Sequence, residues 1–495
     1  MLPISLRPNG RRVVIVGGGN VAARKAESIA GAGFPIFVVA LRVGDRMRSI
    51  LSESGGTYEQ RAYEACDLQN ASLVIAATDD PELNGRIVAD ARATHALVCD
   101  AAVPGRGDFT MPATQRIGEL TISADSGGSA PAFSRRVVAD LAQTLGAPYA
   151  GAVRTIAQIR AYVKETFPEK ERAPILRALA QRPISELAAA PMAVVCATRR
   201  SELATIQSRS IAARLAERAI ATTLLGVTTT GDRDRQTPID RLGAVNVFVK
   251  ELESALRERR ADYAVHSAKD LAASLADDLR IAAISRREDA RDAFCSERYP
   301  EFESLPAGAV VGTSSPRRQA QLAALRPDLR YESLRGNVDT RLRKLQAGEY
   351  DAIVLAMAGL NRLGAGARYV APFAPEHVVP AVGQGALAIE IRADDERLAT
   401  VLRDAVNDGE SELCVTCERA ALRTLRAGCS APLGIYAKLG AETMVVQGAF
   451  APPAAALTRA RLERKISTLA QAEALGAELA ELLNASNANA MGVGS

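Results

Sequence analysis

The chain has 495 residues, 48% of them hydrophobic, and it is too long for one ordinary core, so we expect roughly three to five domains. Its net charge of +4 is small for this length and argues against a nucleic-acid-binding protein, whose basic residues cluster on one face. Seven cysteines without regular spacing exclude a secreted disulfide scaffold. No signal-peptide pattern and no apolar run of about 18 residues is present, so we expect a cytoplasmic protein without membrane segments.

The first zone alternates short β-branched runs with helical stretches, which is typical of βαβ units on a parallel sheet. The predicted strands are 12–16, 36–39, 73–75 and 96–98. Residues 131–190 carry apolar positions at helical spacing and end in the Ala- and Pro-rich stretch 187–191, where we place the main boundary. A new α/β alternation begins at Met192. From about Asn407 we predict a helix, several short strands and a final helix over 468–483.

A glycine-rich turn, 17–22, joins the first strand to a helix and fits the dinucleotide-binding pattern G-x-G-x-x-G/A. Its glycines let the backbone approach a pyrophosphate, and the helix supplies free N–H donors at its positive end. The second strand ends without the acidic residue that would hold the adenosine ribose, and Arg42 is placed to meet a phosphate instead. Both NAD and NADP therefore stay open as cofactors.

The segment from Leu2 to about Lys164 resembles the precorrin-2 dehydrogenase/sirohydrochlorin ferrochelatase module of siroheme synthases. The matching motifs are 17–25, 76–80 with Leu83 and Asn84, 111–113 and 126–131. The resemblance implies a Rossmann domain, a dimerisation segment that predicts a homodimer, a helical domain, and precorrin-2 as a substrate. With the turn itself, it gives an NAD site made of Gly17, Gly19, Asn20, Val21, Leu41, Arg42 and Thr78.

One departure from that module concerns its catalytic aspartate, which precedes a proline. This chain reads Val103-Pro104 there, so the carboxylate is missing or displaced. Asp100 and Asp108 lie nearby as substitutes, and we interpret His95 as a surface histidine rather than a metal ligand. We predict no metal site. The module is either an NAD-dependent dehydrogenase, with ferrochelatase activity open, or a structural domain with an inactive cofactor site.

From Ala197 to about Asn484 the chain resembles hydroxymethylbilane synthase, also called porphobilinogen deaminase. Six motifs in order carry the resemblance: 248–253, 264–270, 312–318, 334–341, 381–386 and 428–434. It implies that four porphobilinogen units are joined into hydroxymethylbilane, with loss of ammonia, on a covalent dipyrromethane primer. The family belongs to porphyrin and heme biosynthesis.

Porphobilinogen carries an acetate and a propionate, so the growing product is a polyanion that needs fixed cations. The resemblance places carboxylate-binding groups at Arg199, Ser201, Ser315, Arg317, Arg318, Arg335, Arg341, Arg362 and Gln384. Two family features are changed: Val245-Asn246 replaces Lys-Gly in a loop, and Leu271-Ala272-Ala273 replaces a segment with proline. We expect altered substrate affinity from both changes.

The catalytic residues that the resemblance implies are Asp270, Lys269 and Cys429. A carboxylate at Asp270 would stabilise the electron-poor azafulvene formed when ammonia leaves, and Lys269 would pair with substrate carboxylates. Small residues around Cys429 leave its sulfur accessible for the thioether that anchors the dipyrromethane. We interpret His266 as a packed histidine. The Cys414 and Cys417 pair is interpreted as core thiols rather than a zinc or redox site.

The predicted architecture is a multidomain α/β protein. We expect a Rossmann domain (1–112), a dimerisation segment (113–150), a helical domain or linker (151–190), and two α/β lobes like those of periplasmic binding proteins. The first lobe is 191–288 plus 381–407 and the second is 289–380. A small α+β domain (408–495) presents the cofactor cysteine. The rival hypothesis is an anion-binding protein, because paired α/β lobes with an arginine-lined cleft also suit that function.

Overall fold

The computed structural model describes residues 2–228, 249–426, 431–441, 443–452 and 456–490. The chain divides into two compact units, Met1–Arg154 and Thr155–Ser495. This division lies upstream of 187–191, where the main boundary was expected. Within the described residues, no helix is both long and apolar enough to cross a membrane.

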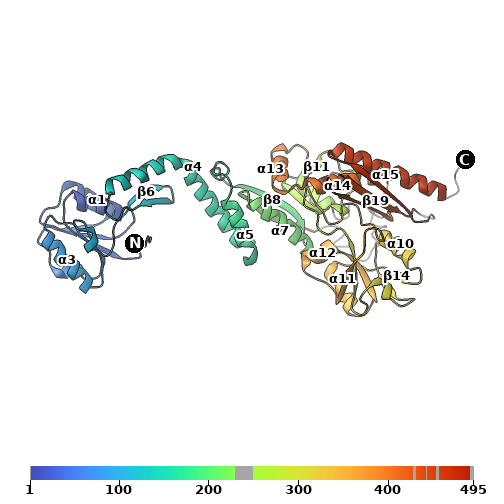
Figure 1. Ribbon diagram of the computed structural model, residues 1–495, viewed down its shortest axis with the longest axis horizontal. Coiled ribbons are helices and arrows are strands. Elements are labelled where there is room, and N and C mark those ends of the chain that lie inside the picture. Colours follow the sequence, from blue (N-terminus) through green and yellow to red (C-terminus); the bar gives the residue numbers. More distant parts are fainter. Residues whose placement is uncertain (1, 229–248, 427–430, 442, 453–455, 491–495) are drawn as a thin grey trace. The chain divides into compact units, whose positions relative to one another are not determined.

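Unit 1 is built on a five-stranded parallel sheet in the order β3-β2-β1-β4-β5. Helices α1 and α2 pack on one face, and α3 packs on the other; Figure 1 labels α1 and α3. The strands are β1 (Arg12–Val16), β2 (Ile36–Val39), β3 (Thr57–Glu59), β4 (Ala71–Ala76) and β5 (Leu97–Asp100), and the helices are α1 (Asn20–Ala30), α2 (Asp45–Ser54) and α3 (Pro81–Ala93). The strand order reverses direction next to β1, where doubly wound sheets bind ligands. The Rossmann prediction is confirmed.

A hairpin and a long helix complete unit 1. Strands β6 (Ala113–Ile117) and β7 (Leu120–Ala124) pair antiparallel. Helix α4 (Pro131–Thr166) is interrupted at Gly146, whose φ of 61° and ψ of −165° are not helical. Pro148 follows, and because proline lacks an amide hydrogen it cannot continue the helical hydrogen-bond ladder.

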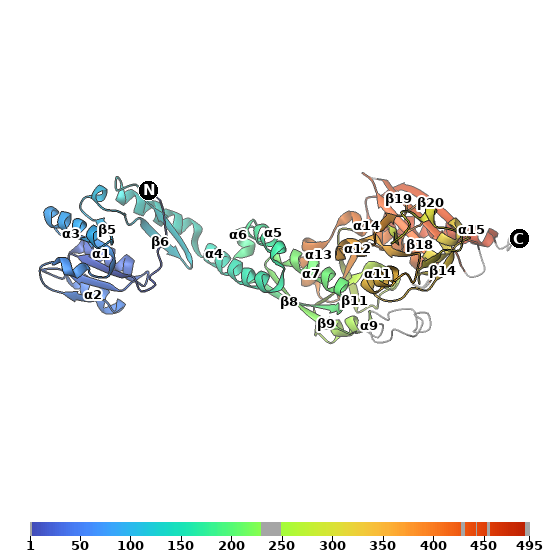
Figure 2. The ribbon, with the colours of Figure 1, turned by 90° about the horizontal axis from the view of Figure 1, so that it is seen from below.

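Unit 2 begins with the helical segment that ends at the first strand of its sheet. The second part of α4 buries Ile159 and Val163, and Phe167 is buried directly after it. Helices α5 (Glu169–Ala180) and α6 (Ile184–Leu187) follow. Helix α5 lies beside α7 (Glu202–Ala216) (Figure 2). The Tyr162 hydroxyl donates to the carbonyl of Thr222 over 2.9 Å. The segment therefore packs on the following sheet and belongs to the same compact unit.

Two five-stranded sheets form the main body of unit 2. The first, ordered β11-β17-β10-β8-β9, has β17 antiparallel to both its neighbours, and the second is ordered β14-β13-β15-β12-β16. Because β17 comes after the whole second sheet in sequence, the chain crosses between the lobes twice. The strands are β8 (Met192–Arg199), β9 (Ile220–Val227), β10 (Tyr263–Ser267), β11 (Leu279–Ile284), β12 (Asp292–Ser296), β13 (Val310–Gly312), β14 (Arg330–Glu332), β15 (Ala352–Ala356), β16 (Tyr369–Pro372) and β17 (Leu387–Arg392).

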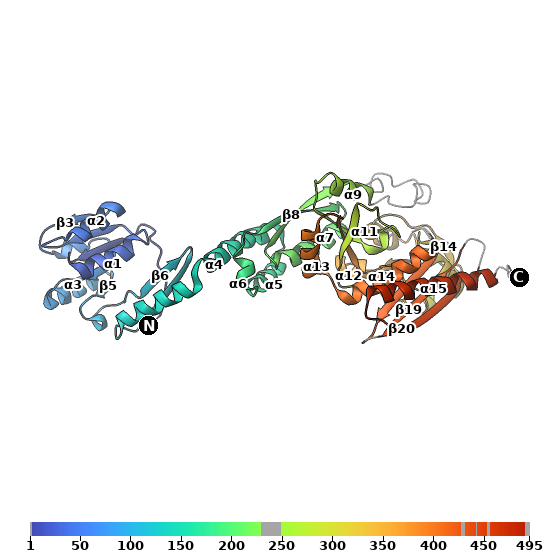
Figure 3. The same ribbon diagram turned by 90° about the horizontal axis from the view of Figure 1, so that it is seen from above.

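Helices connect and cover these strands, and a third layer closes the unit. The helices are α9 (Lys250–Arg257), α10 (Pro316–Leu325), α11 (Val338–Gln346), α12 (Met357–Leu363) and α13 (Glu396–Val406). The last part is an antiparallel sheet of β18 (Leu433–Leu439), β19 (Thr443–Phe450) and β20 (Thr458–Lys465). Helices α14 (Gly409–Thr424) and α15 (Leu469–Ala490) pack on it (Figure 3). The predicted fold class, two α/β lobes followed by a small α+β domain, is confirmed.

Candidate active site and dinucleotide site

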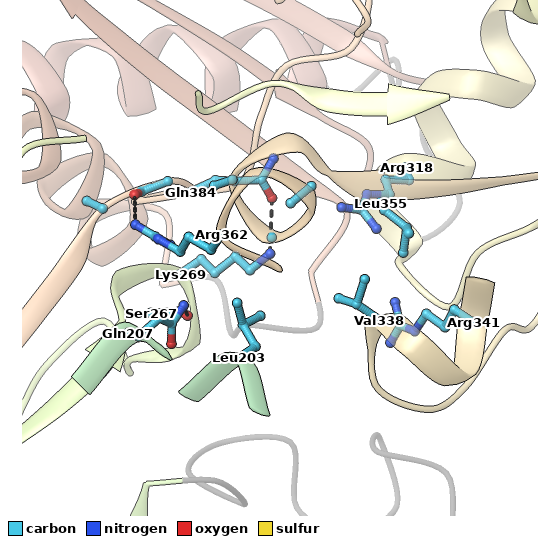
Figure 4. A pocket seen from close by; sticks show the side chains of 15 residues that line it. Leu203, Gln207, Ser267, Lys269, Arg318, Val338, Arg341, Leu355, Arg362 and Gln384 are labelled. Atoms are coloured by element: carbon cyan, nitrogen blue, oxygen red, sulfur yellow. Dashed lines mark hydrogen bonds between the residues drawn. The ribbon is translucent and has the colours of Figure 1, made fainter. Parts of the chain in front are cut away.

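A pocket of about 100 Å³ lies between the two α/β lobes of unit 2 (Figure 4). One side comes from α7, the end of β10 and the segment before β17, and the other from α10, α11, β15 and α12. Its polar lining is strongly cationic and consists of Gln207, Ser267, Lys269, Arg318, Arg341, Arg362 and Gln384. Such a lining suits a ligand with several carboxylates.

Lys269 reaches the pocket from a short 3-10 helix, η3 (Ala268–Asp270), that directly follows β10. Its Nζ donates to Oε1 of Gln384 over 3.3 Å. Desolvation lowers the pKa of Lys269 to about 8, while the charge of Asp270 opposes this effect. Asp270 itself is exposed and makes no hydrogen bond to any residue in the described part of the chain. Its carboxylate therefore remains available to a ligand.

Asp292, at the start of β12, organises the floor of the site and is fully buried. It accepts hydrogen bonds from Arg317 Nη1 (2.6 Å), Arg318 Nη2 (2.7 Å) and Gln384 Nε2 (2.9 Å). Burial by itself would raise the pKa of Asp292, but the two guanidinium groups hold that pKa far below its ordinary value. Sequence reasoning missed this residue, and its only signal was a charged side chain at the head of an apolar strand.

The predicted arginines therefore fall into two groups. Arg318, Arg341 and Arg362 line the pocket, and burial lowers the pKa of each, that of Arg341 to about 10. Arg317 is 5% exposed, and its Nη1 donates to Asp292 and to the Val379 carbonyl. It does not line the pocket but holds Asp292, which in turn binds the pocket residue Arg318.

The remaining predicted carboxylate-binding residues are not among those that line this pocket in the described part of the chain. Arg199 ends β8, and Arg335 precedes α11. The hydroxyls of Ser201 and Ser315 cap α7 and α10 by accepting from backbone N–H groups. Two of our predictions, Cys429 as the cofactor anchor and the changed loop at Val245-Asn246, fall on 427–430 and 229–248, outside the described residues.

Three side chains that we interpreted as structural are buried. His266 is 6% exposed, and its Nε2 lies 2.9 Å from Oε2 of Glu390. Cys414 and Cys417 lie in the core of the third domain, where burial raises the pKa of both thiols, that of Cys414 to about 11. Their surroundings fit packing roles. No group of three or more His, Cys, Asp or Glu side chains is placed for a metal ion among the described residues.

In unit 1 the glycine turn after β1 has the geometry of a phosphate-binding loop. Gly17 has a φ of +127°, and a Cβ there would lie 2.2 Å from the Ala77 carbonyl oxygen. At Gly18 a Cβ would lie 2.0 Å from the Arg42 carbonyl oxygen, whereas Gly19 faces open space. Gly19 is the N-cap of α1 and has no side chain that could occupy the first helix amides. The turn therefore leaves room for a phosphate beside the amides of Asn20 and Val21.

Other predicted dinucleotide contacts border this turn. Val21 and Leu41 are 43% and 72% exposed, which is unusual for large apolar side chains and leaves them free for a flat ring. Thr78 is held at the end of β4, where its amide and hydroxyl both donate to Oδ1 of Asn84 (3.1 and 2.7 Å). The predicted dinucleotide-binding residues thus lie together at the carboxyl ends of β1, β2 and β4.

The two candidate substitutes for the missing catalytic aspartate have structural partners. Asp100 accepts from Arg106 Nε (2.5 Å) and from the amides of Ala102 and Val103. Burial by itself would raise the pKa of Asp100, but these bonds keep that pKa below its ordinary value. Asp108 accepts from Arg92 Nη2 (2.9 Å) and from the Val98 amide.

His95 is exposed in the turn before β5, with a φ of +61°. This position fits our interpretation of a surface histidine.

Fold and site together define a class: an α/β protein with a cationic cleft between two lobes, joined to a dinucleotide-binding domain. Family models give the particular family. "Porphobilinogen deaminase, dipyromethane cofactor binding domain" matches residues 194–400, the "Porphobilinogen deaminase, C-terminal domain" matches 412–485, and "Putative NAD(P)-binding" matches 4–113. The chain belongs to the porphobilinogen deaminase family, which makes it a transferase of tetrapyrrole biosynthesis with a domain for the dipyrromethane cofactor.

Two sequence relatives agree with this family. The porphobilinogen deaminase of Albidiferax ferrireducens is 47% identical over 291 residues, which is 58% of this chain and 92% of the relative. That of Methylobacillus flagellatus is 49% identical over 261 residues, covering 52% and 84%. Among solved structures, SirC, a precorrin-2 dehydrogenase, has a TM-score of 0.33 at 22% identity and covers 36% of this chain and 89% of its own. An extracellular-binding protein of an amino-acid ABC transporter from Bacillus subtilis has a TM-score of 0.27 at 9% identity, covering 43% and 90%.

Proposed function

We propose that unit 2 joins four porphobilinogen units head to tail into hydroxymethylbilane. The observation that carries the proposal is the cationic pocket at η3: Lys269, Arg341 and Arg362 line it, and the exposed Asp270 directly follows Lys269 and interacts electrostatically with Lys269 and Arg341. These cations match the acetate and propionate that each pyrrole carries. When bound, the dipyrromethane supplies the free α-carbon to which the first substrate is joined.

The residues around the pocket divide the chemical work. Arginine and lysine side chains hold the carboxylates of the substrate and of the bound pyrroles, so that each new ring meets the free α-carbon. Ammonia leaves porphobilinogen and creates an electron-poor azafulvene. Asp270 accepts a hydrogen bond from the pyrrole N–H and stabilises the positive charge. It also takes up the proton that the α-carbon loses after the new carbon–carbon bond forms. Gln384 accepts from Lys269 and donates to Asp292, so it fixes the position of Lys269 relative to that buried carboxylate.

Intact-protein mass spectrometry tests the proposal. Wild-type protein given porphobilinogen is expected to gain stepwise pyrrole masses on the peptide that contains Cys429. Cys429→Ala, supplied with preformed hydroxymethylbilane, is expected to gain none. Cys414→Ala serves as the matched control, because that thiol is buried in the core, and it should be modified like the wild type. Equal modification of Cys429→Ala and wild type would exclude Cys429 as the anchor, and no porphobilinogen consumption by folded protein would favour an anion-binding function.

We infer that unit 1 binds a nicotinamide dinucleotide at the turn of Gly17 and Gly19, and that precorrin-2 is its candidate substrate. When bound, the nicotinamide supplies a hydride acceptor. The chain contributes the open phosphate loop and the exposed apolar residues beside it. Because Asp100 and Asp108 are both engaged by arginines, proton transfer by either carboxylate is expected to be slow.

An assay with NAD or NADP and precorrin-2 separates the two candidate roles of unit 1. Slow oxidation that is lost in Asp100→Asn supports a dehydrogenase with Asp100 as the displaced base. Dinucleotide binding without any oxidation supports a structural domain with an inactive site.

We also propose that unit 1 forms a homodimer. Large apolar side chains are exposed along its N-terminal segment and its long helix: Leu2 (83%), Ile4 (64%), Phe133 (64%) and Leu141 (43%). A second copy of the same surface would bury them. Sedimentation of the full chain should give a dimer that Phe133→Glu dissociates, and a wild-type monomer at micromolar concentration would contradict this.

A further inference from the structure

The loop that follows β2, residues 40–44, is fixed directly against the glycine turn of unit 1. The Gly44 amide donates to the Gly18 carbonyl over 3.2 Å, and the Arg42 carbonyl is packed so closely on Gly18 that a Cβ there would lie 2.0 Å from its oxygen. In a Rossmann domain, the residue at the end of the second strand meets the ribose of the adenosine. Arg42 therefore stands at the place that discriminates between the two kinds of ribose.

The charges around this loop favour the binding of an anionic ligand. Residues 39–44 contain no acid. The nearest carboxylate on the adjoining strand is Glu59, the register partner of Val39, and it is paired with Arg61 at 2.6 Å. Asp45 opens α2, where it lies at the positive end of the helix. The loop thus offers no carboxylate of its own to accept a ribose 2′-hydroxyl.

Arg42 has an uncommitted guanidinium. Its neighbours on α2 are engaged, since Arg46 pairs with Glu27 at 2.6 Å and Arg48 donates to the Val43 carbonyl. Arg42 is exposed and makes no hydrogen bond or ion pair with any residue that the structure describes. An unpaired arginine beside a phosphate-binding turn is placed to hold a second phosphate.

We propose that unit 1 selects a dinucleotide with a phosphate on the 2′ position of the adenosine ribose, the NADP class, and that Arg42 is the residue that determines this specificity. The proposal rests on dinucleotide binding by unit 1 and goes beyond it. Guanidinium and phosphate form charge-assisted, bidentate hydrogen bonds. The exposed Leu41 gives the adenine an apolar surface next to that contact. A dinucleotide with a free 2′-hydroxyl would meet no carboxylate in this loop to accept its hydrogen bond, and it would carry no phosphate for Arg42 to bind.

Isothermal titration calorimetry of the full chain with NADP+ and with NAD+ tests the proposal. We expect wild-type protein to bind NADP+ at least about tenfold more tightly than NAD+, as one charge-assisted contact predicts. Arg42→Ala should lose this preference, because its affinity for NADP+ should fall much further than its affinity for NAD+. Arg42→Asp should reverse it, because the new carboxylate repels the phosphate and accepts the 2′-hydroxyl. Arg46→Ala is the matched control, since it removes the same charge four residues further on and should keep the preference.

Three outcomes would overturn the inference. They are equal wild-type affinities for the two dinucleotides, an Arg42→Ala variant that weakens both alike, and a control that loses the preference as strongly as Arg42→Ala. If folded wild-type protein binds neither dinucleotide, the proposed binding function of unit 1 fails and the inference fails with it. Circular dichroism of each variant separates loss of binding from loss of folding.

Discussion

Arg287 and Glu418 form a buried two-pronged ion pair, with N–O distances of 2.6 and 3.2 Å. Glu418 also accepts from the amides of Gly383 and Ala437, and Arg287 donates to the carbonyl of Gln384. One pair of charges thus connects both crossings between the lobes to the third domain. It also holds the backbone of Gln384, the residue that orients Lys269.

Removing the carboxylate of this pair should destabilise unit 2 strongly. We expect Glu418→Ala to lower the free energy of unfolding by about 3–5 kcal/mol, because it leaves the buried guanidinium of Arg287 without its carboxylate partner. The control is Glu412→Ala on the same helix, whose partner Arg403 is half-exposed; it should cost about 1 kcal/mol or less. Urea unfolding measures both. Similar losses in the two variants would contradict a special role for the buried pair.

The affinity for porphobilinogen should fall as pH rises through the pKa of Lys269. Because desolvation lowers this pKa to about 8, the ammonium form that attracts carboxylates is complete below that pH and is lost above it. We expect the wild-type KM to rise between about pH 7 and about pH 9, while the pKa of Arg341, about 10, leaves that side chain charged over this range.

Lys269→Gln separates this effect from other titrations in the site. Its KM should be high at all pH values and should show no inflection near pH 8. A variant that keeps the wild-type pH profile would show that another group is responsible.

Two neighbouring glycines of unit 1 should respond differently to alanine. Gly18→Ala should destabilise unit 1 by about 3 kcal/mol, because its Cβ would overlap the Arg42 carbonyl. Gly19→Ala meets open space and should change stability by less than about 1 kcal/mol. It should nevertheless weaken dinucleotide binding, since the methyl group occupies the approach to the phosphates. Thermal unfolding and calorimetry measure the two effects, and tight binding by Gly19→Ala would place the dinucleotide elsewhere.

The helical segment before β8 should contribute to the stability of the deaminase unit. Tyr162→Phe removes the hydrogen bond to Thr222 on β9 and is expected to cost about 1 kcal/mol. Tyr299→Phe is the control, because its hydroxyl has no hydrogen bond in the described part of unit 2. The unfolding transition of unit 2 reports both variants. If Tyr162→Phe leaves that transition unchanged, the segment is only a spacer.

Much of the fold follows from local patterns in the chain. β-branched runs predict β1, β2 and β4 closely, and the glycine pattern after the first run predicts the turn between β1 and α1. The arginine that follows β2 in place of an acidic residue, Arg42, and the shortened loop at Val103 are likewise visible in the sequence. Each of these features depends on residues that are near one another along the chain, so the sequence alone is enough to predict it.

Only the tertiary structure decided how the deaminase site is arranged. Arg317 and Arg318 look equivalent in the sequence, yet only Arg318 lines the pocket, while both neutralise Asp292, 25 and 26 positions away. Gln384 reaches the same carboxylate from 92 positions away, because β17 brings the chain back to the first lobe. A buried charge must find its partners inside the protein, and which partners it meets depends on how distant segments pack, which no local pattern contains.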